Sequence, residues 1–138
     1  MLKPNVAIVE DDQDDYELLA FSIIENYVNC EILHIDNGYI AAEYFRKVKN
    51  APDLIFLDVN LPQIKGGELI RIIRKSSVLE TVPIIVNSNN NDPFIISELM
   101  KFGATEFIKK PSVISEYYKF SDAISRYTNR KILTNLLA

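Results

Sequence analysis

The fold of this chain is decided by one stretch, Asp53-Leu54-Ile55-Phe56-Leu57-Asp58-Val59-Asn60-Leu61-Pro62. Its apolar run lies between Pro52 and Pro62 and lacks the alternation of polar and apolar residues that a half-exposed strand shows. The run therefore predicts a parallel strand that is buried on both faces. The strand ends at Asp58, on the edge of an open α/β sheet where ligands usually bind.

The composition is that of an ordinary folded protein, with 48% hydrophobic residues, 25% charged residues and only four glycines in 138 residues. This length suits a single domain over 1–138, with a core from about residue 5 to about residue 127 and a C-terminal helix and tail to 138. The formal net charge of -4 would repel phosphate backbones, so direct binding of nucleic acid is not expected.

The single cysteine, Cys30, has no second cysteine with which to form an internal disulfide. The apolar segment that follows Met1 is too short for a signal sequence or a membrane span. We therefore expect a cytoplasmic protein that does not contact a membrane.

Strands and helices alternate along the whole sequence. Apolar runs predict four strands besides the opening stretch, at residues 5–9, 30–35, 82–86 and 106–109. Helical spacing predicts helices from about residue 12 or 14 to about 27, at 39–48, from 66–67 to about 75, at 93–102, and from about 113 to about 127. The tail after Arg126 either prolongs the last helix or frays. This alternation predicts a flavodoxin-like (βα)5 fold, a doubly wound parallel sheet with strand order 2-1-3-4-5.

In that order, polar residues from four loops meet at one edge of the sheet. They are Glu10-Asp11 after the first strand, Asp58, Ser88 after the fourth strand, and Lys110 after the fifth. Carboxylates this close need a counter-charge to stay ionised, and Mg²⁺ is the natural one because it takes oxygen ligands and keeps positions open for phosphate oxygens. The hypothesis is that Asp58 accepts a phosphoryl group, with Lys110 and Ser88 contacting that group.

With these residues in view, the chain resembles the receiver domain of two-component response regulators over about residues 5 to 127. Five separated signals agree in order: Val9-Glu10-Asp11-Asp12, the segment from Leu57 to Pro62, Gly66, Ser88 and Lys110-Pro111. The resemblance implies single-domain receivers of the chemotaxis-regulator or phytochrome-partner kind. In the family, the bond before the proline of the last motif is typically cis.

The resemblance also implies a role for each site residue. Asp58 is the phosphoacceptor, Asp11 and Asp58 are direct Mg²⁺ ligands, Glu10 is a ligand through water, and the backbone carbonyl of Asn60 is a further ligand. Ser88 is the switch hydroxyl. Lys110 is the lysine that neutralises the phosphoryl group.

Two positions depart from the family pattern. Asn89 is larger than the small residue that usually follows the switch hydroxyl, and Phe107 stands where the family often has a switch tyrosine. An aromatic side chain at position 107 can still move between buried and exposed positions, but it has no hydroxyl to hydrogen-bond.

The implied function is that of a signalling domain, a phosphoacceptor that catalyses its own phosphorylation and dephosphorylation. The phosphoryl donor is a sensor histidine kinase or a phosphotransfer protein. Phosphorylation would switch the face formed by the fourth helix, the fifth strand and the fifth helix, for binding an unidentified downstream protein or for homodimerisation.

Several plainer interpretations stand beside this one. Acidic residues 10–12 can simply begin a helix, where negative charge is favourable, and Asp12, Asp14 and Asp15 are interpreted as surface and capping residues. His34 lies in a predicted strand with no cysteine or second histidine in reach, so a role as metal ligand or base is not expected. A haloacid-dehalogenase-like phosphatase also uses a strand-end aspartate with Mg²⁺, but it needs a second acid two residues later, where this chain has Asn60.

Overall fold

The computed structural model describes residues 3–26 and 28–137, and for residues 129–137 it describes the helical backbone alone. Five parallel strands form one sheet in the order β2-β1-β3-β4-β5. The strands are β1 (Asn5–Val9), β2 (Glu31–Ile35), β3 (Leu54–Asp58), β4 (Ile84–Ser88) and β5 (Glu106–Lys109). The predicted flavodoxin-like fold and its strand order are thus confirmed.

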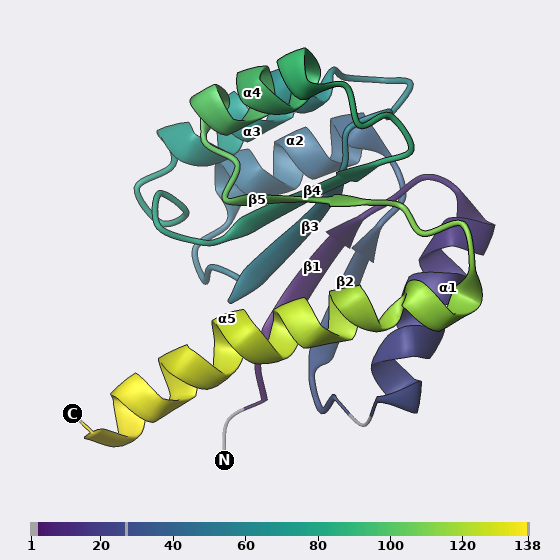
Figure 1. Cartoon of the computed structure of the whole chain (residues 1–138). Coiled ribbons are helices and arrows are strands. Elements are labelled where there is room, and N and C mark those ends of the chain that lie inside the picture. Colours follow the sequence, from purple (N-terminus) through teal and green to yellow (C-terminus); the bar gives the residue numbers. More distant parts are fainter. Residues whose placement is uncertain (1–2, 27, 138) are drawn as a thin grey trace.

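Helices cover both faces of this sheet (Figure 1). On one face lie α2 (Gly38–Lys47), α3 (Gly66–Lys75) and α4 (Pro93–Phe102), and on the other lie α1 (Gln13–Glu25) and α5 (Tyr118–Leu137). A short 3-10 turn, Ile114–Glu116, precedes α5. The fifth helix therefore begins later than predicted, and its backbone continues through the tail. The predicted end of the first helix, residue 27, lies outside the described residues.

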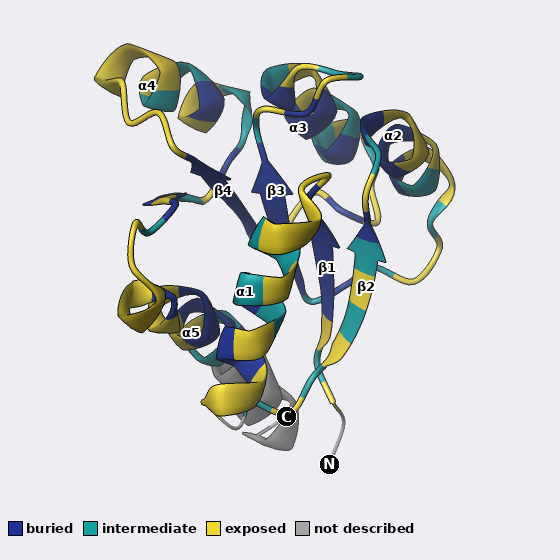
Figure 2. Cartoon of the chain, turned by 90° about the vertical axis from the view of Figure 1, so that its right-hand side faces the viewer, coloured by how far each residue is buried: buried dark blue, intermediate teal, exposed yellow. Residues whose placement is uncertain are grey.

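The strand of the opening stretch is buried at all five positions, as its composition predicts (Figure 2). Successive side chains point to opposite faces of a strand. Ile55 and Leu57 accordingly pack in the core under α2, α3 and α4, whereas Leu54 and Phe56 pack in the core under α1 and α5. A strand with two buried faces holds Asp58 at a fixed place on the sheet edge.

The fourth strand lies two residues later than its apolar run suggests, at Ile84–Ser88 rather than 82–86. Pro83 has no N–H to donate to a neighbouring strand, so ladder pairing begins after it, with its carbonyl accepting a hydrogen bond from the Ile55 N–H at 3.0 Å. At the other end the strand continues through polar residues, with Asn87 paired opposite Asp58. This shift makes Ser88 the last residue of the strand.

Local signals set several helix ends. The side chain of Asp92 accepts a hydrogen bond from the Phe94 N–H at 2.8 Å, and Pro93 occupies the first turn of α4. Gly103 ends the same helix with a φ of 123°, a conformation that favours glycine.

The Lys110–Pro111 peptide bond is trans, so the cis bond implied by the family resemblance is not present.

Arg74, at the end of α3, links two turns that are distant in sequence. Its Nε donates to the Gly103 carbonyl at 2.9 Å, and its Nη1 donates to the carbonyls of Leu79 at 2.9 Å and Val82 at 2.7 Å. Its Nη2 reaches the Thr105 hydroxyl at 3.4 Å. The guanidinium therefore satisfies carbonyls in the loops that precede β4 and β5.

Replacing Arg74 by Met should lower the free energy of unfolding by about 2 kcal/mol, because hydrogen bonds from a charged donor are lost and partly buried carbonyls are left unpaired. Urea denaturation followed by far-UV circular dichroism measures this change. Arg46→Met, at an exposed position on α2, is the matched control and should change stability by less than about 0.5 kcal/mol. Equal losses in the two variants would contradict the role assigned to Arg74.

Candidate functional site

The carboxyl ends of β1, β3, β4 and β5 meet at one edge of the sheet. Asp58 and Ser88 are the last residues of their strands, Glu10 directly follows β1 and Lys110 directly follows β5. All four side chains are buried, although each is polar or charged. The structure thus brings the predicted group together at the predicted edge.

Three carboxylates in this group lie close enough to share one cation. One oxygen from each of Glu10, Asp11 and Asp58 lies within 4.8 Å of the other two. Glu10 and Asp58 are each only 3% exposed, whereas Asp11 is open to solvent. Hard oxygen donors with one solvent-facing side fit Mg²⁺, which binds through few carboxylates and retains water ligands.

Lys110 supplies positive charge directly beside two of these carboxylates, Glu10 and Asp58. Its Nζ lies 2.9 Å from Glu10, 3.1 Å from Asp58 and 2.8 Å from Asp15. Burial alone would lower the pKa of Lys110, but hydrogen bonds to Asp15 and Glu10 and the charges of Asp58 and Glu10 outweigh it and raise the pKa. The ammonium therefore remains charged, and its three N–H donors have three carboxyl groups as acceptors.

Asp15 was interpreted from the sequence as a surface or capping residue, and that interpretation was wrong. It lies in the first turn of α1, where its carboxylate binds Lys110 and its backbone N–H donates to the Asp12 cap at 2.9 Å. With Asp12 as the N-cap, the first turn of α1 carries Asp15 on the side that faces the sheet edge. The sequence allowed the helix to begin at about residue 12 or 14, so it did not show which acidic residue faces the site.

The Glu10 carboxyl is the most perturbed acid of the site. Burial is the main cause, followed by a hydrogen bond and charge repulsion from Asp58, and together these raise the pKa of Glu10 from 4.5 to about 8. Lys110 acts in the opposite direction without cancelling the effect. A divalent cation at this position would favour the ionised carboxylate.

Ser88 and Asn60 connect the loops after β3 and β4. The Asn60 side-chain amide donates to the Ser88 Oγ at 2.8 Å, and the Asn90 backbone N–H donates to the same oxygen at 3.0 Å. A hydroxyl can accept two hydrogen bonds and still donate one. The Asn60 backbone N–H also donates to Asp58 Oδ1 at 2.9 Å, which holds this loop against the carboxylate.

The two departures from the family pattern occupy different surroundings. Asn89 is exposed beside Ser88. Phe107 is partly buried and packs against the core under α2, α3 and α4. In this structure the aromatic ring therefore lies inward.

His34 contacts the site through the backbone, a contact that the sequence did not indicate. Its Nε2 lies 2.9 Å from the Glu10 carbonyl oxygen, which can only accept, so this nitrogen carries the proton. The ring stacks flat on Tyr16, with centroids 3.5 Å apart. His34 is not in the carboxylate group, and it fixes the backbone from which Glu10 extends.

Among the described residues, none of the helices combines the length and the apolar character needed to cross a bilayer.

Comparison with known proteins gives a consistent result. The model of the response regulator receiver domain matches residues 6–120. The two-component response regulator ORR11 of Oryza sativa subsp. indica is 29% identical over 108 residues, which are 78% of this chain and 71% of that protein. The regulator ORR1 of Oryza sativa subsp. japonica is 40% identical over 112 residues, which are 77% of this chain but only 48% of that longer protein.

Solved structures agree in fold. The phosphorylated cyanobacterial phytochrome response regulator RcpA superposes with a TM-score of 0.83 at 23% identity, covering 92% of this chain and 95% of that one. The Mn²⁺-bound form of response regulator Rcp1 superposes with a TM-score of 0.78 at 19% identity, covering 90% and 93%.

The raised pKa of Glu10 predicts how stability depends on pH without metal. Between about pH 4.5 and pH 8 the folded protein holds a proton that the unfolded chain has released, so the free energy of unfolding should fall as pH rises. The largest slope that one titrating group can give is about 1.4 kcal/mol of unfolding free energy per pH unit. Urea denaturation in the presence of EDTA, at several pH values in this window, measures the slope.

Glu10→Gln should flatten this slope, since the amide does not titrate. Glu25→Gln, at an exposed position in the last turn of α1, should leave it unchanged. Saturating Mg²⁺ should oppose the decline, because the cation binds the ionised form. A slope that persists in Glu10→Gln would assign the titration to another group.

Proposed function

Because this chain belongs to the receiver domain family of two-component response regulators, we propose that it accepts a phosphoryl group on Asp58 from a histidine kinase or a phosphotransfer protein. One observation carries this proposal: the buried Asp58 carboxylate at the end of β3, 3.1 Å from the Lys110 ammonium and inside a group of three carboxylates. The family acts as a phosphoacceptor in signalling and not as a conventional enzyme.

The transfer itself is a displacement at phosphorus. A carboxylate oxygen of Asp58 attacks the phosphorus of a phosphohistidine, the P–N bond breaks, and its electron pair returns to the imidazole nitrogen of the donor. The product is an aspartyl phosphate. Attack by water on phosphorus later restores the carboxylate and releases inorganic phosphate, so this chain provides the groups for both steps.

Mg²⁺ is the proposed cofactor, held directly by Asp11 and Asp58, through water by Glu10, and by the backbone carbonyl of Asn60. When bound, the ion supplies positive charge that offsets the carboxylates and the incoming phosphoryl oxygens. The donor chemistry of the carboxylate group supports this assignment.

Lys110 contacts the phosphoryl group only if it gives up a present partner. Its three N–H donors already have Glu10, Asp15 and Asp58 as acceptors. The Asp15 side chain is 31% exposed, whereas that of Glu10 is 3% exposed, so Asp15 returns to water at the lowest cost. Asp58 loses its carboxylate charge when it becomes an acyl phosphate, so a phosphoryl oxygen replaces Asp58 or Asp15 on the ammonium.

Ser88 provides the second contact to the phosphoryl group. Its oxygen accepts from Asn60 and Asn90, and its own O–H is left to donate. When the Ser88 hydroxyl donates to a phosphoryl oxygen, the side chain moves toward that group and displaces the loop after β4, which is bonded to Ser88 through Asn90. This loop leads directly into α4. Movement of Phe107 accompanies this change, and the face of α4, β5 and α5 shifts between two states.

The proposed output is a change in what that face binds, either a downstream protein or a second copy of this chain. The proposed receiver unit is one domain with its core at about residues 5–127. A phosphatase of the haloacid-dehalogenase kind is disfavoured, because Asn60 provides an amide where that chemistry needs an acid.

The phosphoacceptor assignment predicts the fate of the chain with acetyl phosphate and Mg²⁺. Intact-mass spectrometry should detect the gain of one phosphoryl group, lost on acid or hydroxylamine treatment, as an acyl phosphate requires. Asp58→Asn should abolish the gain. Asp36→Asn makes the same chemical change at an exposed position after β2 and should behave as the unaltered chain.

Phosphorylation that persists in Asp58→Asn would overturn the assignment. So would the absence of any adduct with acetyl phosphate, phosphoramidate and beryllofluoride while the unaltered protein remains folded by circular dichroism.

A further inference from the structure

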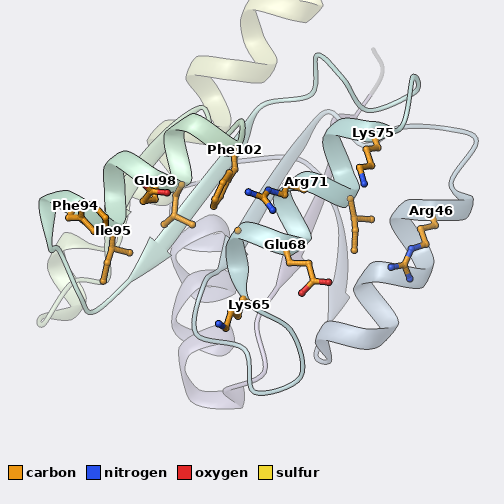
Figure 3. Close-up of a pocket in the computed structure, with 12 residues that line it drawn as sticks. Arg46, Lys65, Glu68, Arg71, Lys75, Phe94, Ile95, Glu98 and Phe102 are labelled. Carbon is orange, nitrogen blue, oxygen red and sulfur yellow. The ribbon is translucent and has the colours of Figure 1, made fainter.

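A groove of about 600 Å³ runs between α3 and α4, on the side of the sheet away from α1 and α5 (Figure 3). Its walls are the facing sides of these two helices, and Arg46 of α2 lies at its rim. It shares only α4 with the face of α4, β5 and α5. The groove is therefore a separate surface.

The interior of the groove is apolar. Leu99 and Phe102 of α4 and Ile72 of α3 line it, and Phe94 and Ile95 form one lip, with exposures of 72% and 38%. A phenylalanine that is 72% exposed leaves most of its apolar surface in water, and burial of that surface favours association. The apolar lining thus offers anchor positions for a ligand.

The opposite wall is positively charged. Four basic side chains and two carboxylates line the groove, whereas the whole chain has a net charge of -4. The Arg71 guanidinium lies 4.1 Å from the centroid of the Phe102 ring, which holds it over the apolar floor. Lys75 and Arg46 extend the positive side toward the rim (Figure 3).

The dimensions of the groove suit a helix. Helices α3 and α4 have ten residues each, so each wall is about 15 Å long at 1.5 Å per residue. A third helix of about three turns can lie along the groove, above the contact between α3 and α4, with apolar residues at i, i+3, i+4 and i+7 as anchors. The basic wall selects for acidic residues beside those anchors.

We propose that the groove between α3 and α4 is a docking site for an acidic amphipathic helix of a partner protein. The apolar face of that helix packs on the exposed side chains of Phe94 and Ile95, and its acidic residues face Arg71, Lys75 and Arg46. The interaction surface differs from the face of α4, β5 and α5 that is switched in the proposed function, although the two share α4.

The test uses the unphosphorylated full chain, labelled with ¹⁵N, and two synthetic peptides of about four helical turns. Both peptides carry leucine and phenylalanine at helical spacing; one has glutamate at the flanking positions and the other has lysine. Titration followed by NMR should give saturable shifts at groove residues with the acidic peptide, and affinity lower by about tenfold or more with the basic peptide.

Matched variants locate the site. The double variant Arg46→Glu/Lys75→Glu reverses two charges at the groove and should weaken binding of the acidic peptide by about tenfold or more. Lys3→Glu/Lys49→Glu changes the net charge equally at exposed positions outside the groove and should bind as the unaltered chain.

Four outcomes would overturn the proposal: equal affinity for the two peptides, shifts that map to another face, equal weakening in the two double variants, or no binding at millimolar peptide. Shifts at the groove that grow with protein concentration in the absence of peptide would instead assign it to a second copy of this chain.

Discussion

One buried ammonium group holds the functional edge of this molecule together. Lys110, after β5, binds carboxylates that come from β1, α1 and β3. Removal of one partner from a buried ionic group leaves uncompensated charge, which costs far more than a surface ion pair contributes. The ends of three separate strands and the start of one helix are therefore fixed relative to one another by a single side chain, before any ligand arrives.

The sequence predicted the parts of the structure that depend on local pattern. An apolar run between two prolines gave a doubly buried strand, Gly103 gave a helix end, and the position of Asp58 and Lys110 at strand ends gave the main groups of the site. Each of these follows from spacing or from the backbone preference of one residue type. The strand order then needed only the alternation of strands and helices.

The remainder depended on side-chain contacts between distant segments. Asp15 reaches Lys110 because of the way α1 is oriented about its axis. His34 reaches the Glu10 carbonyl because β2, at the edge of the sheet, lies beside β1. The carbonyl partners of Arg74 lie up to 29 residues away in the sequence. No periodicity encodes such contacts, because many residues on the same helix face satisfy the same pattern.

Two adjacent glycines give the site and the groove a common wall. A Cβ at Gly66 would lie 2.8 Å from the Val59 side chain, next to Asp58, and a Cβ at Gly67 would lie 2.6 Å from the Phe102 ring on the groove floor. The first turn of α3 is thus in direct contact with both, with no flexible side chain between them to absorb displacement. A displacement at the phosphoacceptor site is therefore passed to the groove with little loss. An alanine at Gly66 would push α3 away from Val59, and an alanine at Gly67 would push it away from Phe102.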